Sequence, residues 1–200
     1  MIPGMELSID GPEAPGRDPD ASAELEWLRD FVNTNDIEGE ADELGTPRLL
    51  RAWLLAGKLI PTGTAVHADA HRRAIAIREG LRALGSANNG EPIDIDRVEA
   101  LNQVAAGLPV VVSAQPDGWR LSPAAAPGVD GFLASLMATV AQSMADGSWS
   151  RVKACRRDTC RWLFFDHSRN RSGTWCSMAG CGSRMKARAY RARQREAASA

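Results

Sequence analysis

Residues 155–181 read CRRDTCRWLFFDHSRNRSGTWCSMAGC and hold all four cysteines of the 200-residue chain. Four residues lie within each cysteine pair and fifteen lie between the pairs. Paired thiolates on two tight turns can close a tetrahedron around zinc, and four sulfur ligands leave no position for water or substrate. We therefore predict one structural zinc ion per chain, bound by Cys155, Cys160, Cys176 and Cys181.

Three other states of these thiols are considered: two disulfides, four unrelated buried cysteines, and a labile zinc–thiolate redox switch. The equal gaps argue against unrelated thiols. Residues 1–20 lack the basic and apolar regions of a secretory signal, and their Gly, Pro and Asp content predicts a disordered arm. No run of 18 apolar residues is present, so no membrane span is expected. We expect a cytoplasmic protein, whose thiols stay reduced.

Charge is divided unevenly along the chain. Residues 151–200 carry 13 Lys and Arg and three acids, a net charge of +10. Residues 1–150 carry 11 basic and 22 acidic residues, a net charge of −11. Such a division indicates two units with different partners, because the basic unit attracts nucleic acid and the acidic unit repels it.

The basic unit ends in RMKARAYRARQREA, residues 184–197, which contains no Gly or Pro and predicts a helix. Its four arginines at spacings of four, three and four share one face, and two further cations lie on a second strip. Two loop arginines between the cysteine pairs extend the predicted phosphate-binding surface. The predicted nucleic-acid-binding residues are Arg169, Arg171, Arg184, Lys186, Arg188, Arg191, Arg193 and Arg195. An acidic protein face, including this chain's own N-terminal part, and a merely solvated helix are the alternatives.

The rest of the chain predicts a mainly α fold. It has a helical N-terminal domain with a β-hairpin, followed by a C-terminal treble-cysteine-turn-type zinc finger with a terminal basic helix. Three-and-four spacing of apolar residues predicts helices. Asp146-Gly147-Ser148 reads as a hinge, which predicts a domain at 21–147 and a finger at 151–197. The expected helices cover about 22–34, 47–57, 66–85, 94–107 and 128–146, and the hairpin covers 110–121.

Residues 151–195 closely resemble the CGNR zinc finger, a bacterial C-terminal module. The resemblance rests on the four cysteines, Phe165-Asp166, Ser168-Arg169-Asn170, Trp175-Cys176-Ser177-Met178 and Cys181-Gly182-Ser183-Arg184. Ser183 stands where the family has asparagine; because both side chains cap helices, we expect a helix to begin there.

Residues 25–145 resemble the ABATE domain that accompanies this finger in stress-induced transcription regulators. The resemblance rests on Phe31-Val32-Asn33-Thr34, the helix of Leu49 to Leu59, Arg78-Glu79 with Leu81 to Leu84, and the hairpin at Gly118-Trp119. The two resemblances together imply regulation and DNA binding.

One other set of residues could bind a metal. His67 and His71 lie one helical turn apart with Asp69 between them, as in some zinc hydrolases. No glutamate follows His67 in the H-E-x-x-H manner, and no third ligand is evident, so we favour a solvated polar face.

The resulting functional hypothesis is a DNA-binding transcription regulator with an N-terminal regulatory or sensing domain. The alternative is a zinc-dependent protein- or RNA-interaction module without specific DNA binding. No nucleophile motif, P-loop or dinucleotide fingerprint is present, so we expect no enzymatic activity.

Overall fold

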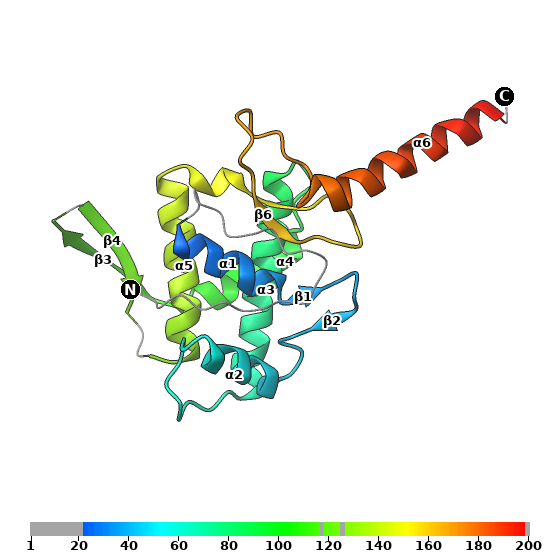
Figure 1. Ribbon diagram of the computed structural model, residues 1–200. Helices are drawn as coiled ribbons and strands as arrows, with labels where there is room; N and C mark the ends of the chain where they lie inside the picture. The colour runs from blue at the N-terminus through cyan, green and yellow to red at the C-terminus, as the bar shows by residue number, and fades with distance from the viewer. Residues whose placement is uncertain (1–21, 117, 125–126, 199–200) are drawn as a thin grey trace.

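The computed structural model describes residues 22–116, 118–124 and 127–198, so the predicted arm at 1–20 lies outside the described residues. The mainly α class is confirmed (Figure 1). The helices are α1 Ala23–Asn33, α2 Pro47–Ala56, α3 Ala68–Asn88, α4 Ile95–Ala105, α5 Val129–Ala145 and α6 Ser183–Ala198. Three antiparallel pairs of strands join β1 Asn35–Asp36 to β2 Ala41–Asp42, β3 Val110–Gln115 to β4 Gly118–Pro123, and β5 Val152–Ala154 to β6 Leu163–Phe165.

Local capping explains where three helices begin. The side chains of Ser22, Thr46 and Asp94 each accept a hydrogen bond from the backbone N–H three residues later. Such a bond satisfies one of the four amides that a helix leaves free at its start. The predicted start of α2 is confirmed, and Asp94 caps α4.

The end of α3 differs from the prediction, which placed it at Gly85. The helix continues to Asn88, and Gly85 is a buried interior residue. A Cβ atom on Gly85 would overlap Cδ2 of Leu163 and lie 3.3 Å from the Ala154 nitrogen, so glycine leaves room for β6 against α3. Gly85 allows α3 and β6 to approach each other closely. The prediction of a helix end at this glycine is therefore wrong.

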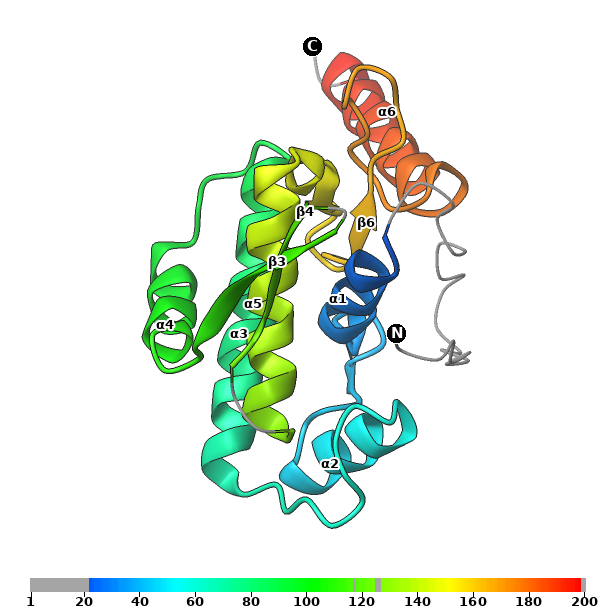
Figure 2. The same ribbon diagram turned by 90° about the vertical axis from the view of Figure 1, so that its left-hand side faces the viewer.

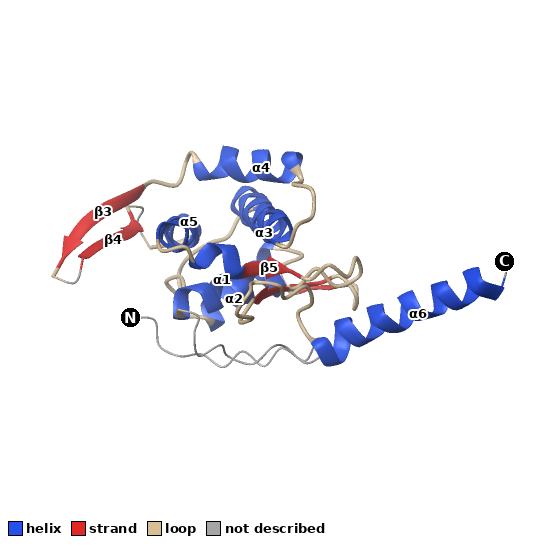
Figure 3. Ribbon diagram, turned by 90° about the horizontal axis from the view of Figure 1, so that it is seen from above, coloured by secondary structure: helices blue, strands red, loops and turns tan. Residues whose placement is uncertain are grey.

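The core lies around two long helices. Figure 2 shows α3 and α5 running side by side, and Figure 3 looks along both with α1 beside them. Three aromatic rings from α1, α2 and α5 meet here, with Phe31 centred 5.9 Å from Trp53 and 5.4 Å from Phe132. Edge and tilted ring contacts at these distances favour a well-defined packing.

The C-terminal part shares this core. Trp149, Val152, Ala154 and Leu163 belong to the same buried cluster as the residues of α1, α3 and α5. The predicted hinge at 146–148 therefore does not separate two hydrophobic cores. The domain limits of 21–147 and 151–197 stay a prediction about sequence organisation.

The predicted β-hairpin is present and projects from the body (Figure 1). Its turn includes residue 117, which lies outside the described residues. Val112 on β3 and Trp119 on β4 are 62% and 73% exposed, so the hairpin adds little to the core. None of the described helices is long and apolar enough to cross a membrane.

Candidate metal centre and nucleic-acid interface

The first cysteine pair lies on the turn of the β5–β6 hairpin. The Cys155 N–H donates to the Trp162 carbonyl at 2.8 Å, and the Cys160 N–H donates to the Arg157 carbonyl at 2.8 Å. Arg161 has a φ of +55°, which turns the chain back into β6. The tight turn points both sulfurs to one side.

The second pair lies at the start of the terminal helix. Ser177 precedes a π-helical turn, Met178–Gly182, and its hydroxyl accepts a hydrogen bond from the Gly180 N–H at 3.1 Å. The turn contains Cys181 and continues directly into α6. The expected capping role of Ser183 is therefore wrong: this residue has helical dihedral angles, and its hydroxyl donates to the Met178 carbonyl at 2.9 Å.

The two pairs bring four sulfurs together. All four Sγ atoms lie within 4.8 Å of one another, and Cys176 Sγ lies 3.7 Å from both Cys160 Sγ and Cys181 Sγ. Zinc–sulfur bonds of about 2.3 Å make a tetrahedron with sulfur–sulfur edges of about 3.8 Å. The cysteines are free and mostly buried, so this donor set fits zinc and no disulfide joins it. The chain holds one structural zinc ion through Cys155, Cys160, Cys176 and Cys181.

Ionisation of the thiols explains why the cluster needs a cation. Hydrogen bonds from Cys160 and Cys176 lower the pKa of the Cys155 thiol. Hydrogen bonds with Cys155 and Cys160, and then burial, raise the pKa of the Cys176 thiol, which would otherwise carry a second negative charge beside the first. Four thiolates at these distances are stable together only around a metal, whose binding is therefore coupled to folding.

Two tryptophans cover the cluster. Trp162 is buried against the sulfurs, and Trp175 packs beside them as a partly buried residue. This arrangement supports shielding of the metal from water. Arg157 approaches from the open side, with a terminal nitrogen 3.8 Å from Cys181 Sγ. Its charge offsets part of the thiolate charge.

A buried ion pair orders the loop between the cysteine pairs. Asp166 accepts a hydrogen bond from Lys153 Nζ at 2.6 Å and from the backbone N–H groups of Ser168 and Gly173. Burial opposes ionisation, but these bonds outweigh it and lower the pKa of Asp166 to about 2. Asp166 thus orders the loop through its ion pair with Lys153.

The basic helix α6 extends away from the body to the C-terminus (Figure 1). Arg184, Arg188, Arg191 and Arg195 share one face, and Lys186 and Arg193 lie on the opposite face. All six are exposed. Within the described part of the chain, no residue forms an ion pair with Lys186, Arg188, Arg191 or Arg193. The exposed side chains of Lys186, Arg188, Arg191 and Arg193 can thus contact an anionic partner.

The two predicted loop arginines lie on the loop between the cysteine pairs. Arg169 is exposed. Arg171 has a φ of +51°, and its guanidinium donates to the Ser150 hydroxyl at 2.8 Å. Their assignment to a nucleic-acid surface stays a prediction.

Two charged residues that the sequence did not single out lie at the base of α6. Glu38, on the turn between β1 and β2, pairs with Arg157 of the first cysteine turn and with Arg184 of α6. More than a hundred residues separate Glu38 from each arginine, so no local pattern could reveal the contact.

The histidine pair does not form a metal site. His71 Nε2 lies 2.6 Å from the Leu44 carbonyl, and Asp69 pairs with Arg72 and Arg73. His67 is an exposed residue that precedes α3. In the described ranges, the four cysteines are the one cluster of potential metal ligands.

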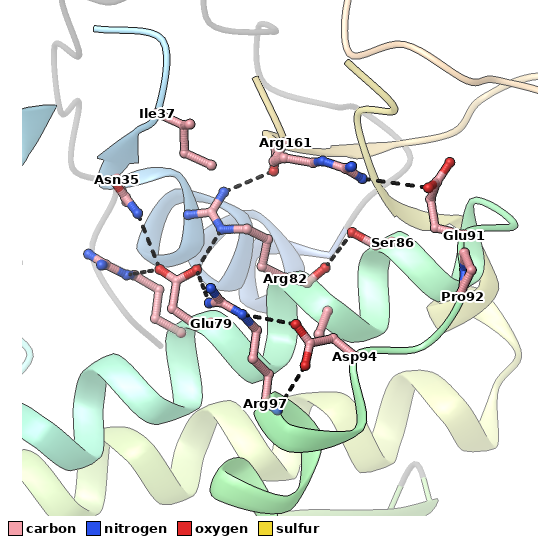
Figure 4. A pocket seen from close by; sticks show the side chains of 12 residues that line it. Asn35, Ile37, Glu79, Arg82, Ser86, Glu91, Pro92, Asp94, Arg97 and Arg161 are labelled. Carbon is pink, nitrogen blue, oxygen red and sulfur yellow. Dashed lines mark hydrogen bonds and ion pairs between the residues drawn. The ribbon is translucent and has the colours of Figure 1, made fainter. Parts of the chain in front are cut away.

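A charged pocket of about 600 Å³ is lined by residues of the N-terminal part together with Arg161 of the finger (Figure 4). Glu79 of α3 accepts hydrogen bonds from Arg78, Arg82 and Arg97. Arg82 also donates to the carbonyl of Arg161 at 2.9 Å. Burial opposes ionisation of Glu79, but Arg82 and Arg78 outweigh it and lower the pKa of this carboxyl. The network connects α3 to the first cysteine turn.

Two protein-family models match the chain and confirm both resemblances. The CGNR zinc finger matches residues 151–194. ABATE, described as "Putative stress-induced transcription regulator", matches residues 25–147. No curated protein matches the chain.

Proposed function

Because the chain belongs to the ABATE family and ends in a CGNR zinc finger, we propose that it is a DNA-binding transcription regulator. In this proposal the zinc centre fixes the first turn of α6, and α6 presents its cations to DNA phosphates. The protein works in the cytoplasm, beside the chromosome. No catalytic activity is assigned to it.

The observation that carries the proposal is the exposed arginine face of α6, anchored at one end by the zinc ligand Cys181. A helix with this charge repels itself unless an anion neutralises it. Phosphates on a regular duplex can meet arginines that recur every three or four residues.

The regulatory part of the proposal rests on the pocket of Figure 4. Its wall includes α3 residues together with Arg161 of the finger. A molecule bound there contacts both parts of the chain and can thereby alter how the finger is held.

The test measures binding of the zinc-loaded full chain to fluorescent duplexes by anisotropy over a range of salt concentrations. If α6 contacts phosphates, the double substitution Arg188→Ala and Arg191→Ala weakens binding to every sequence. It also reduces the slope of log K against log salt by about 2, since each phosphate contact contributes about 0.9.

The matched control removes two exposed arginines elsewhere, by Arg48→Ala with Arg120→Ala. This control loses the same charge and should keep the wild-type slope. Absence of any affinity for DNA or RNA in low salt would overturn the proposal. A preference for RNA would favour the interaction-module alternative.

A further inference from the structure

Glu38, on the turn between β1 and β2, places its carboxylate at the base of α6. Both oxygens of Glu38 accept hydrogen bonds from the two terminal nitrogens of Arg157, with Nη1 to Oε2 at 2.7 Å. Arg184 Nη1 donates to Oε1 of the same carboxylate at 2.9 Å. Two guanidinium groups thus hold one anionic side chain.

The donor set is suited to phosphate as well as to carboxylate. A guanidinium presents parallel N–H groups in a plane, a geometry that matches two oxygens of either anion. Arg157 is held firmly, because it is only 16% exposed and also lies against the Cys181 sulfur. Arg184 is 57% exposed and begins the arginine face of α6. The pair therefore continues that face onto the zinc centre.

We propose that Arg157 and Arg184 form a binding site for a backbone phosphate of nucleic acid, and that Glu38 occupies this site in the free protein. The inference rests on the proposed function and deepens it. Glu38 and the phosphate compete, so the free chain masks part of its own interface. Displacement of the carboxylate opens the site when nucleic acid binds.

The contact has the properties of a reversible competitor. The Glu38 side chain is 32% exposed, so solvent reaches the ion pair and a competing anion can replace the carboxylate. The turn does not need the Glu38 side chain for its shape, because Asp36 Oδ1 accepts hydrogen bonds from the N–H groups of Glu38 and Gly39. Removing the Glu38 charge should therefore leave the fold in place.

The test compares Glu38→Gln with wild-type protein in duplex titrations of the full, zinc-loaded chain. The variant should bind about two- to fivefold more tightly, the range expected when a partly exposed ion pair no longer competes. Glu40→Gln is the matched control: it removes the same charge from the same turn, where Glu40 is exposed.

A double-mutant cycle separates competition from general repulsion. In a chain with Arg157→Ala and Arg184→Ala, binding should be weaker, and Glu38→Gln should no longer strengthen it beyond the effect of Glu40→Gln. Thermal unfolding of each variant checks that the fold persists.

Each remaining outcome overturns the inference. If Glu38→Gln binds no more tightly than Glu40→Gln, Glu38 is not a competitor, and the proposed function stands alone. If Glu38→Gln binds more weakly and unfolds at lower temperature, the contact is a structural clamp. If wild-type protein binds no nucleic acid, the proposed function fails first and this inference fails with it.

Discussion

The side chain of Asn33 pairs with the backbone of Leu163 as a neighbouring strand residue would. Its Oδ1 accepts a hydrogen bond from the Leu163 N–H at 2.7 Å, and its Nδ2 donates to the Leu163 carbonyl at 3.0 Å. All of these groups are buried. The side-chain amide of Asn33, at the end of α1, thereby provides hydrogen-bond partners for the backbone of Leu163 in β6. This contact links the N-terminal helices to the finger.

Replacing this amide should destabilise the whole chain. Asn33→Ala leaves the buried N–H and carbonyl of Leu163 unpaired, and should lower the free energy of unfolding by about 2–4 kcal/mol. Asn33→Asp keeps the acceptor but directs a carboxylate at a carbonyl, so it should not rescue stability. Urea unfolding measures both, with the exposed Asn102→Ala as a control that should change stability by less than about 0.5 kcal/mol.

Gly85 should not tolerate even a methyl group. In Gly85→Ala the new Cβ overlaps Leu163 Cδ2 and lies 3.3 Å from the Ala154 nitrogen. Overpacking should cost about 1–3 kcal/mol, which exceeds the gain in helix propensity of up to about 1 kcal/mol. Gly63→Ala is the control, since nothing lies within 4 Å of its Cβ position. A Gly85→Ala chain as stable as wild type would show that α3 and β6 do not pack this closely.

Asp166 should make stability depend on acid pH. Its pKa in the folded chain is about 2, below the ordinary value of 3.8, so its contribution is present above about pH 4 and is lost as pH falls toward 2. At pH 7, Asp166→Asn should cost about 2–4 kcal/mol, because Lys153 keeps a buried charge without its carboxylate.

The measurement is the difference in unfolding free energy between wild type and Asp166→Asn at each pH. It should be constant above about pH 5 and shrink between about pH 4 and 2. Asp158→Asn, at a side chain 82% exposed, should leave stability nearly unchanged. A difference that does not vary with pH would contradict the lowered pKa.

Zinc removal should loosen more than the finger. Elemental analysis should find one zinc per chain, and a chelator or Cys176→Ser should release it. Because Val152, Ala154 and Leu163 lie in the common core, hydrogen exchange should rise in α1 and α3 as well as in residues 151–182. Added zinc should restore protection in the chelated wild type but not in Cys176→Ser. Faster exchange confined to the finger would mean that the N-terminal part folds alone.

The sequence by itself determined the features that depend on near neighbours. The cysteine spacing predicted the zinc centre, because ligands on one tight turn are close whatever surrounds them. The periodicity of apolar residues predicted the helices, since hydrogen bonds within a helix, such as those to the caps Thr46 and Asp94, are local. The run from Arg184 to Arg195 likewise predicted the basic helix.

Only the tertiary structure decided how these parts meet. From sequence, Gly85 predicts the end of a helix, and only the structure shows that it makes room for Leu163. Likewise, only the structure shows that Asn33, at the end of its helix, pairs with β6. Lys153 was not recognised as the partner of Asp166, nor Glu38 as the partner of Arg157. The physical reason is common to all four: steric contact and ion pairing act over a few ångströms in space, between residues whose separation along the chain carries no sign of it.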